Sequence, residues 1–80
     1  MVELRYFAAA RAALGRSTDT MDVPDGATVG DVVGHLTGAS PEAGPVLARC
    51  AVLLDGRRAA PTDVVPDGSR VDLLPPFAGG

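Results

Sequence analysis

The sequence predicts an α+β fold in which one main helix packs on a mixed β-sheet. Strand-like alternation near both ends of the chain, helical spacing of valines and a leucine near its middle, and glycine-containing turns between the elements all point to this class. Eighty residues make one domain, which we place at 1–80. Within it we expect a globular part over 1–74 and a projecting tail over 75–80.

The start of the chain predicts a strand and then a short helix. Apolar and charged residues alternate over 2–6, which is typical of a half-buried strand. The alanine-rich segment 8–14 follows and stops at Gly15, which indicates a short helix with a glycine end. Phe7 breaks the alternation and falls on the opposite face of the strand. The apolar face consists of Val2, Leu4 and Tyr6.

The next segment predicts a second strand and the main helix. Residues 18–23 alternate, and a Pro-Asp-Gly turn follows at 24–26. Thr28 has the side chain of a helix N-cap, and Asp31 stands where a capping box has its acidic partner. We expect the helix to end at Gly38. Its apolar face consists of Val29, Val32, Val33 and Leu36.

The second half predicts short strands joined by turns. We expect a loop over 38–45, a strand over 51–54 that is buried on both sides, and a short edge strand over 57–60. A second Pro-Asp-Gly turn at 66–68 leads into a last strand over 70–74. In that strand, Val71 and Leu73 form the apolar face and Arg70 and Asp72 the polar face.

Composition and charge disfavour several functions. The net charge is -3, and all seven basic residues are scattered arginines, which disfavours nucleic-acid binding. Cys50 is the only cysteine and His35 the only histidine, so the chain can form neither an internal disulfide nor a Cys/His zinc site. We interpret Cys50 as a small buried hydrophobe and His35 as a surface residue. The sequence suggests no metal and no cofactor.

The N-terminus has no basic start followed by an apolar run, and no apolar run is long enough to span a bilayer. We therefore expect a cytoplasmic protein that does not bind membranes.

The last six residues are Pro75-Pro76-Phe77-Ala78-Gly79-Gly80. Two prolines deny a sheet its amide donors, and two glycines remove all side-chain bulk from the tip. Six extended residues reach about 20 Å, enough to enter a pocket on another protein. We expect Phe7 and Phe77 to belong to an exposed apolar patch that docks on partner enzymes; the alternative is that both fold onto the sheet.

These features together resemble the MoaD/ThiS family of sulfur carriers, and within it the small subunits of molybdopterin synthase. The resemblance covers most of the chain and leaves out the loop at 38–49. Its most specific element is the Pro-Pro-x-x-Gly-Gly ending, since Gly-Gly alone also suits thiazole-pathway carriers and ubiquitin-like modifiers. The matching stretches are LRYFAAARAALG, VPDGATVGDVVGHL, LLDGRRA and PDGSRVDLLPPFAGG.

The resemblance implies a ubiquitin-like β-grasp fold and a carrier that is not itself an enzyme. An ATP-dependent activating enzyme would adenylate the carboxylate of Gly80, sulfur would convert it to a thiocarboxylate, and Gly79 would precede this group in the partner's channel. A sulfur-accepting synthase, such as the large subunit of molybdopterin synthase, would then take the tail. The residues assigned to partner binding are Phe7, Arg11, Pro75, Pro76, Phe77 and Ala78.

Several alternatives stay open at this point. Other sulfur acceptors are a thiazole precursor, a cysteine precursor, a thiolated RNA base and a secondary metabolite. A ubiquitin-like modifier that is joined to lysines of target proteins is a second class, and a plain β-grasp interaction domain with an inert tail is a third. Because the chain contains no lysine, it could not form lysine-linked chains of itself.

Overall fold

The structure is a computed structural model, and it describes residues 1–76. No helix in this part of the chain has the length and apolar character needed to cross a bilayer. The elements in chain order are β1 (Val2–Tyr6), α1 (Ala8–Leu14), β2 (Thr18–Met21), α2 (Val29–Ala39), the 3₁₀ helix η1 (Pro41–Ala43), α3 (Gly44–Leu47), β3 (Ala51–Leu54), β4 (Arg57–Arg58) and β5 (Arg70–Leu74).

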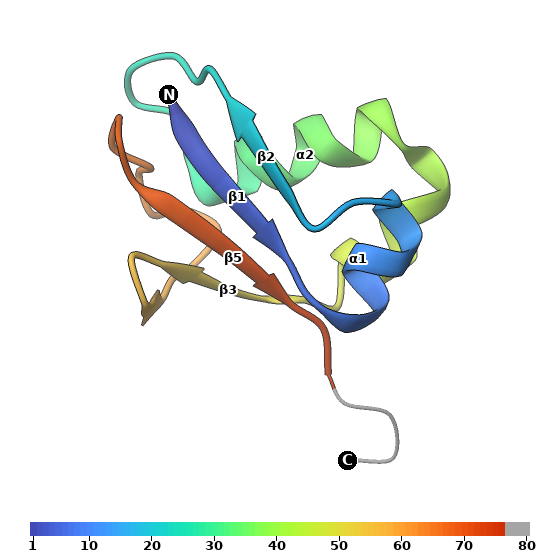
Figure 1. The fold of residues 1–80 in the computed structure, drawn as a ribbon. Coiled ribbons are helices and arrows are strands. Elements are labelled where there is room, and N and C mark those ends of the chain that lie inside the picture. Colours follow the sequence, from blue (N-terminus) through green and yellow to red (C-terminus); the bar gives the residue numbers. More distant parts are fainter. Residues whose placement is uncertain (77–80) are drawn as a thin grey trace.

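The five strands form one sheet in the order β2-β1-β5-β3-β4. β1 and β5 are parallel, while β1 and β2, β3 and β5, and β3 and β4 pair antiparallel. The two segments at opposite ends of the chain therefore lie side by side at the centre of the sheet (Figure 1). A mixed sheet with one main helix, α2, is the predicted α+β, ubiquitin-like β-grasp fold, which is confirmed.

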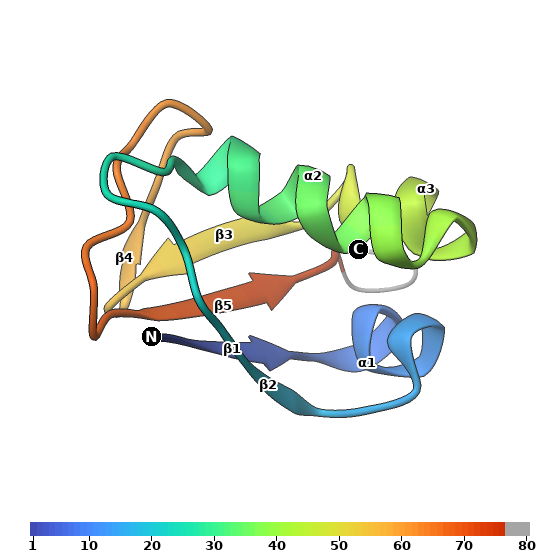
Figure 2. The same ribbon diagram turned by 90° about the horizontal axis from the view of Figure 1, so that it is seen from above.

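The first strand and helix have the predicted bounds. Gly15 ends α1 with a φ of 76°, a left-handed conformation that glycine adopts without a Cβ clash. Its N–H donates to the carbonyl of Arg11 at 2.9 Å, which closes the last turn. Figure 2 shows α1 at the end of the sheet where β1 stops, with α2 running alongside the sheet.

The predicted N-cap of α2 is also confirmed. The Asp31 N–H donates to the hydroxyl of Thr28 at 3.2 Å, and the Thr28 N–H donates to the Asp31 carboxylate at 2.9 Å. This reciprocal pair satisfies two backbone donors that the first turn leaves unbonded. The helix continues one residue past the predicted end at Gly38, because glycine is tolerated in the last turn at a modest cost.

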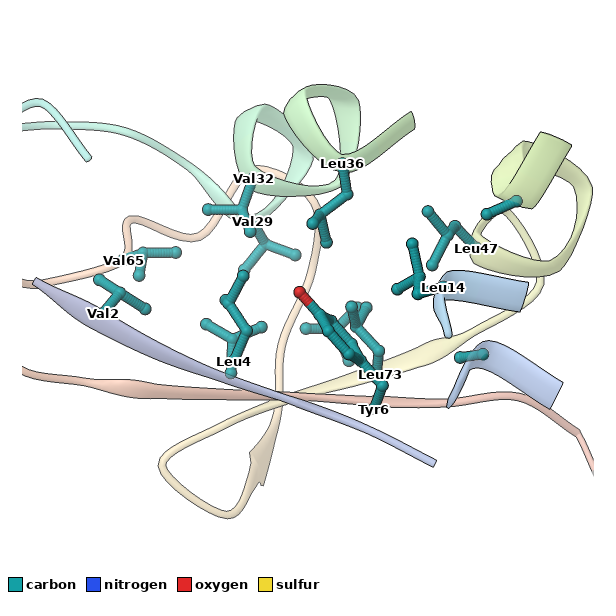
Figure 3. Close-up of a cluster of buried hydrophobic side chains, with 14 residues drawn as sticks. Val2, Leu4, Tyr6, Leu14, Val29, Val32, Leu36, Leu47, Val65 and Leu73 are labelled. Carbon is teal, nitrogen blue, oxygen red and sulfur yellow. The ribbon is translucent and has the colours of Figure 1, made fainter. Parts of the chain in front are cut away.

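The core lies between the sheet and the helices, as Figure 3 shows. The apolar face predicted for β1 is buried completely or almost so. Each large side chain removed from water contributes about 1.5–3 kcal/mol before the entropy cost of ordering it. The cluster consists of Val2, Leu4, Tyr6, Ala10, Leu14, Val29, Val32, Leu36, Ala43, Leu47, Val52, Val65, Val71 and Leu73.

Two segment predictions were wrong in kind. The expected loop over 38–45 contains η1 and the start of α3, because Pro41 occupies a favourable first helical position and the segment buries Ala43 and Leu47 in the core. The strand at 51–54 is not buried on both sides: only Val52 is buried, since the described helices cover just one face of the sheet.

Smaller differences concern strand ends and one acidic residue. β2 stops at Met21, two residues before the predicted end, and β4 stops at Arg58. Asp72 was expected on an open polar face, yet its side chain is only 5% exposed. Asp72 can be buried because two arginines, Arg5 and Arg70, pair with its carboxylate.

Replacing Thr28 with Ala should lower the stability of the whole domain by about 0.5–2 kcal/mol, because one cap donor loses its acceptor. A melting temperature several degrees lower is expected. Thermal unfolding followed by circular dichroism measures this, with Thr62→Ala, an exposed threonine outside the helices and strands, as the control. Equal melting temperatures for the two variants would contradict the role of the cap.

Candidate functional site

The chain leaves the sheet at the end of its central strand, β5. We call Leu74, Pro75 and Pro76 the tail base. β5 is hydrogen-bonded on one side to β1 and on the other to β3, where Leu74 pairs with Ala51. Beyond this pair Pro75 is half-buried and Pro76 is exposed. Since prolines have no N–H to donate, the ladder stops here and the chain leaves the sheet (Figure 1).

The junction between β1 and α1 lies beside the tail base. Phe7 donates its backbone N–H to the carbonyl of Leu73 at 3.2 Å, and the residue is 36% exposed. Ala8 follows with a φ of 49°, a left-handed conformation that costs a non-glycine residue about 1–2 kcal/mol. This sharp turn lets α1 begin immediately after Phe7 and leaves the ring at the surface.

A buried carboxylate holds two arginines on the face of the sheet opposite the core, which we call the helix-free face. Arg5 of β1 lies opposite Asp72 of β5 in the parallel register. Its Nε donates to Asp72 Oδ1 at 2.9 Å and its Nη2 donates to Oδ2 at 3.3 Å. Arg70 Nε is 3.4 Å from the same Oδ1. Asp72 is therefore shielded by two cations, which explains its burial.

The same arginine also contacts the exposed aromatic ring. The guanidinium carbon of Arg5 lies 5.4 Å from the centre of the Phe7 ring, within the range of a cation–π interaction. Asp72, Arg5 and Phe7 thus form a continuous series that ends beside the tail base. The side chains of Leu53 and Leu74 are half-buried on this face.

The predicted partner-binding residues divide into two groups. Phe7 is exposed as expected, and the structure brings it to the same end of the sheet as Pro75 and Pro76. Arg11 is exposed on α1. The other predicted site residues lie outside the described part of the chain, so their roles stay predictions: Phe77, Ala78, Gly79 and Gly80.

Sequence reasoning missed Arg5 and Asp72. Each was assigned to the polar face of its own strand, which was correct, but their contact depends on the pairing of β1 with β5. Opposite charges at matched positions of the first and last strands are a signal that becomes visible only once those strands are known to be neighbours.

Among the described residues, neither the cysteine nor the histidine is arranged for catalysis. Cys50 is half-buried, its Sγ donates to the carbonyl of Val46 at 3.4 Å, and burial raises the pKa of its thiol. A raised pKa keeps the thiol protonated at neutral pH and makes it a poor nucleophile. His35 is exposed on α2. Among residues 1–76, no cluster of three or more His, Cys, Asp or Glu side chains could hold a metal ion.

Fold and site together define a small β-grasp protein whose central strand, β5, leads directly into Pro75 and Pro76. The sequence profile of the ThiS family matches residues 4–80. The chain belongs to the ThiS family, which comprises small sulfur carriers and related ubiquitin-like modifiers. The resemblance found in the sequence is therefore confirmed.

Individual relatives cover almost the whole chain. The chain is 30% identical to the molybdopterin synthase sulfur carrier subunit of Chlamydomonas reinhardtii, over 99% of this chain and 98% of the relative. It is 37% identical to small archaeal modifier protein 3 of Haloferax volcanii, with the same two coverages. The crystal structure of SAMP1 from Haloferax volcanii is 32% identical, covers 99% of this chain and 98% of its own, and superposes with a TM-score of 0.87.

Replacing Phe77 with Ala should weaken partner binding about 10-fold or more, because an exposed aromatic ring buried in an interface is worth about 1.5–3 kcal/mol. The melting temperature should barely change. Titration calorimetry against the activating enzyme and thermal unfolding measure the two effects, and Phe7→Ala should behave in the same way. A melting temperature that falls by several degrees with unchanged affinity would instead make Phe77 part of the core.

Proposed function

We propose that this protein is a sulfur carrier whose working group is the C-terminal carboxylate of Gly80. The observation that carries the proposal is the exit of the chain from the central strand. Leu74 is still held in the ladder, whereas the next two residues are prolines that cannot extend it. Membership of the ThiS family supports the same function.

The chemistry begins with activation, because a free carboxylate has no leaving group for sulfur to displace. A carboxylate oxygen of Gly80 attacks the α-phosphorus of ATP on the activating enzyme and releases pyrophosphate. A sulfur donor then attacks the acyl carbon of the adenylate and releases AMP, which leaves a thiocarboxylate. The oxidation state of the carboxyl carbon does not change in these steps. They therefore need no oxidant when the donor delivers sulfur at the oxidation level of sulfide.

The tail must reach groups that belong to other proteins. Six extended residues span about 20 Å, so residues 75–80 can enter a channel while the globular part stays outside. The small tip formed by Gly79 and Gly80 would pass a narrow opening, and the partner would supply acid–base groups and exclude water. The carrier contributes position, and its partner contributes catalysis.

Molybdopterin synthesis is the pathway we favour. The Chlamydomonas relative is named as the sulfur carrier subunit of molybdopterin synthase, and it matches nearly the full chain. On this proposal the thiocarboxylate of Gly80 donates sulfur to a substrate held by the large subunit of that synthase. The thiocarboxylate sulfur acts as the nucleophile.

A ubiquitin-like modifier is the second candidate, because the Haloferax relative at 37% identity is named as a modifier protein. In that case the activated carbonyl of Gly80 would be attacked by a lysine amine of a target protein and would form an isopeptide bond. The chain has no lysine, so a second copy could not be joined to it through a lysine side chain.

Deleting Gly80 should abolish sulfur transfer and leave the thermal transition almost unchanged, because the last residue of the described core cluster is Leu73. Incubation with the activating enzyme, ATP and a sulfur donor, followed by mass spectrometry, measures thiocarboxylate formation. Ala78→Gly, which keeps the chain end, should remain competent and serves as the control. A protein without Gly80 that still acquires sulfur would refute the assignment.

Replacing Gly79 with Val should block adenylation, because the side chain adds bulk in the channel and restricts backbone angles that glycine can adopt. ATP–pyrophosphate exchange measures this step. Ala78→Val places the same bulk one residue farther from the carboxylate and should reduce the rate less. Normal exchange by Gly79→Val would show that the tip does not thread through a narrow channel.

A further inference from the structure

We propose that Arg5 binds a carboxylate on the surface of the activating enzyme, and that Asp72 is the positioning residue that prepares Arg5 for this contact. The inference rests on the proposed function, since it concerns the protein that activates the tail. It adds the chemistry of the docking contact, which is a bidentate guanidinium–carboxylate pair on the helix-free face.

The burial of Asp72 is the first observation. A carboxylate removed from water costs several kcal/mol unless it is paired and hydrogen-bonded. Asp72 meets this requirement through two hydrogen bonds from Arg5, at 2.9 and 3.3 Å, and through the positive charge of Arg70, whose Nε lies 3.4 Å away. Its side chain is only 5% exposed, although it points away from the helices. The arginines, and not the carboxylate, are therefore what this central part of the face presents to a partner.

The second observation is that Arg5 is held in place while much of its donor capacity remains available. Arg5 uses Nε and Nη2 to bind Asp72, which leaves the two N–H groups of Nη1 and one of Nη2. Its side chain is 40% exposed. The Phe7 ring lies against the guanidinium at 5.4 Å. Because the planar group is already fixed on two sides, binding costs less side-chain entropy than binding by a free arginine.

The chemistry of this group selects its ligand. A fixed guanidinium with adjacent outer N–H groups matches the two oxygens of a carboxylate, which accept a pair of parallel hydrogen bonds. Arg70 adds a second positive charge next to Asp72. Glu3, the acidic side chain of β1 on this face, lies opposite Arg70 in the parallel register, two residues farther from Phe7 than Arg5 is. Near the tail base the exposed charge on this face is therefore that of Arg5, because its partner Asp72 is buried.

The position of Arg5 indicates which protein it meets. Arg5 and Asp72 lie directly across from each other on β1 and β5, and Phe7, two residues beyond Arg5, is hydrogen-bonded to Leu73 just before the tail base. An enzyme that takes residues 75–80 into its active site must lie over this end of the sheet. Arg5 and Phe7 would then contact the rim of its channel together.

Titration of the carrier in ATP–pyrophosphate exchange tests the proposal. Arg5→Ala should raise the KM for the carrier about 10-fold, with unchanged kcat and unchanged KM for ATP, because a charge-assisted bidentate bond at the interface is lost. Arg5→Lys keeps the charge but not the planar fork and should recover only part of the loss. Asp72→Asn, which releases Arg5, should raise the carrier KM by a smaller factor.

Arg57→Ala is the matched control, since it removes one positive charge from the exposed edge strand β4 and should leave the carrier KM unchanged. Raising the salt concentration should increase the wild-type KM more than that of Arg5→Ala.

An unchanged carrier KM for both Arg5→Ala and Arg5→Lys, with melting temperatures near that of the wild type, would overturn the proposal. A changed KM for ATP, with an unchanged KM for the carrier, would show that Arg5 contacts the nucleotide. This result would also overturn the proposal. If Arg5→Ala and Arg57→Ala raise the carrier KM equally, the effect comes from the net charge of the protein. That result would contradict a specific pair between Arg5 and a carboxylate. A wild-type protein that supports no exchange at all would instead refute the proposed function.

Discussion

The parallel pairing of the first and last strands is the constraint on which the rest of the structure depends. β5 lies at the centre of the sheet, its neighbours are β1 and β3, and its inward side chains Val71 and Leu73 are completely buried. Pro75 and Pro76 therefore follow directly on a strand held from both sides. The chain leaves the sheet at one defined place, which is where the proposed carrier function needs its tail to begin.

One-sided coverage of the sheet leaves its other face for recognition. The helices pack on one face and build the core there (Figure 3). The helix-free face carries Arg5, Phe7 and the buried Asp72. An isolated surface ion pair contributes little to stability. Because Asp72 is shielded by two arginines, its value here is to fix the orientation of a guanidinium beside the tail base. β1 and β5 therefore contribute to the core with one face and carry the Arg5–Asp72 pair on the other.

Sequence patterns predicted what is local and missed what depends on distant partners. Alternation gave β1 and its buried face, Gly15 gave the end of α1, and Thr28 with Asp31 gave the start of α2, since each follows from neighbouring residues. The helices at 41–47 were missed because their Gly and Pro content is also typical of loops, and the burial of Ala43 and Leu47 that distinguishes them depends on distant parts of the chain. Arg5 and Asp72 are 67 positions apart in the sequence, so their contact forms only when β1 and β5 pair. The family was predictable from motifs along the chain, whereas the roles assigned to Phe77, Ala78, Gly79 and Gly80 stay predictions.

The state of the C-terminus tests the central claim most directly. Intact mass spectrometry of the protein recovered from its own cells, with fragmentation of the C-terminal peptide, would identify the group on Gly80. We predict a fraction in which one carboxylate oxygen is replaced by sulfur, and we expect it to disappear when the activating enzyme is deleted. A C-terminus found only as an isopeptide on other proteins, or only as the free carboxylate while its pathway is active, would contradict a sulfur carrier.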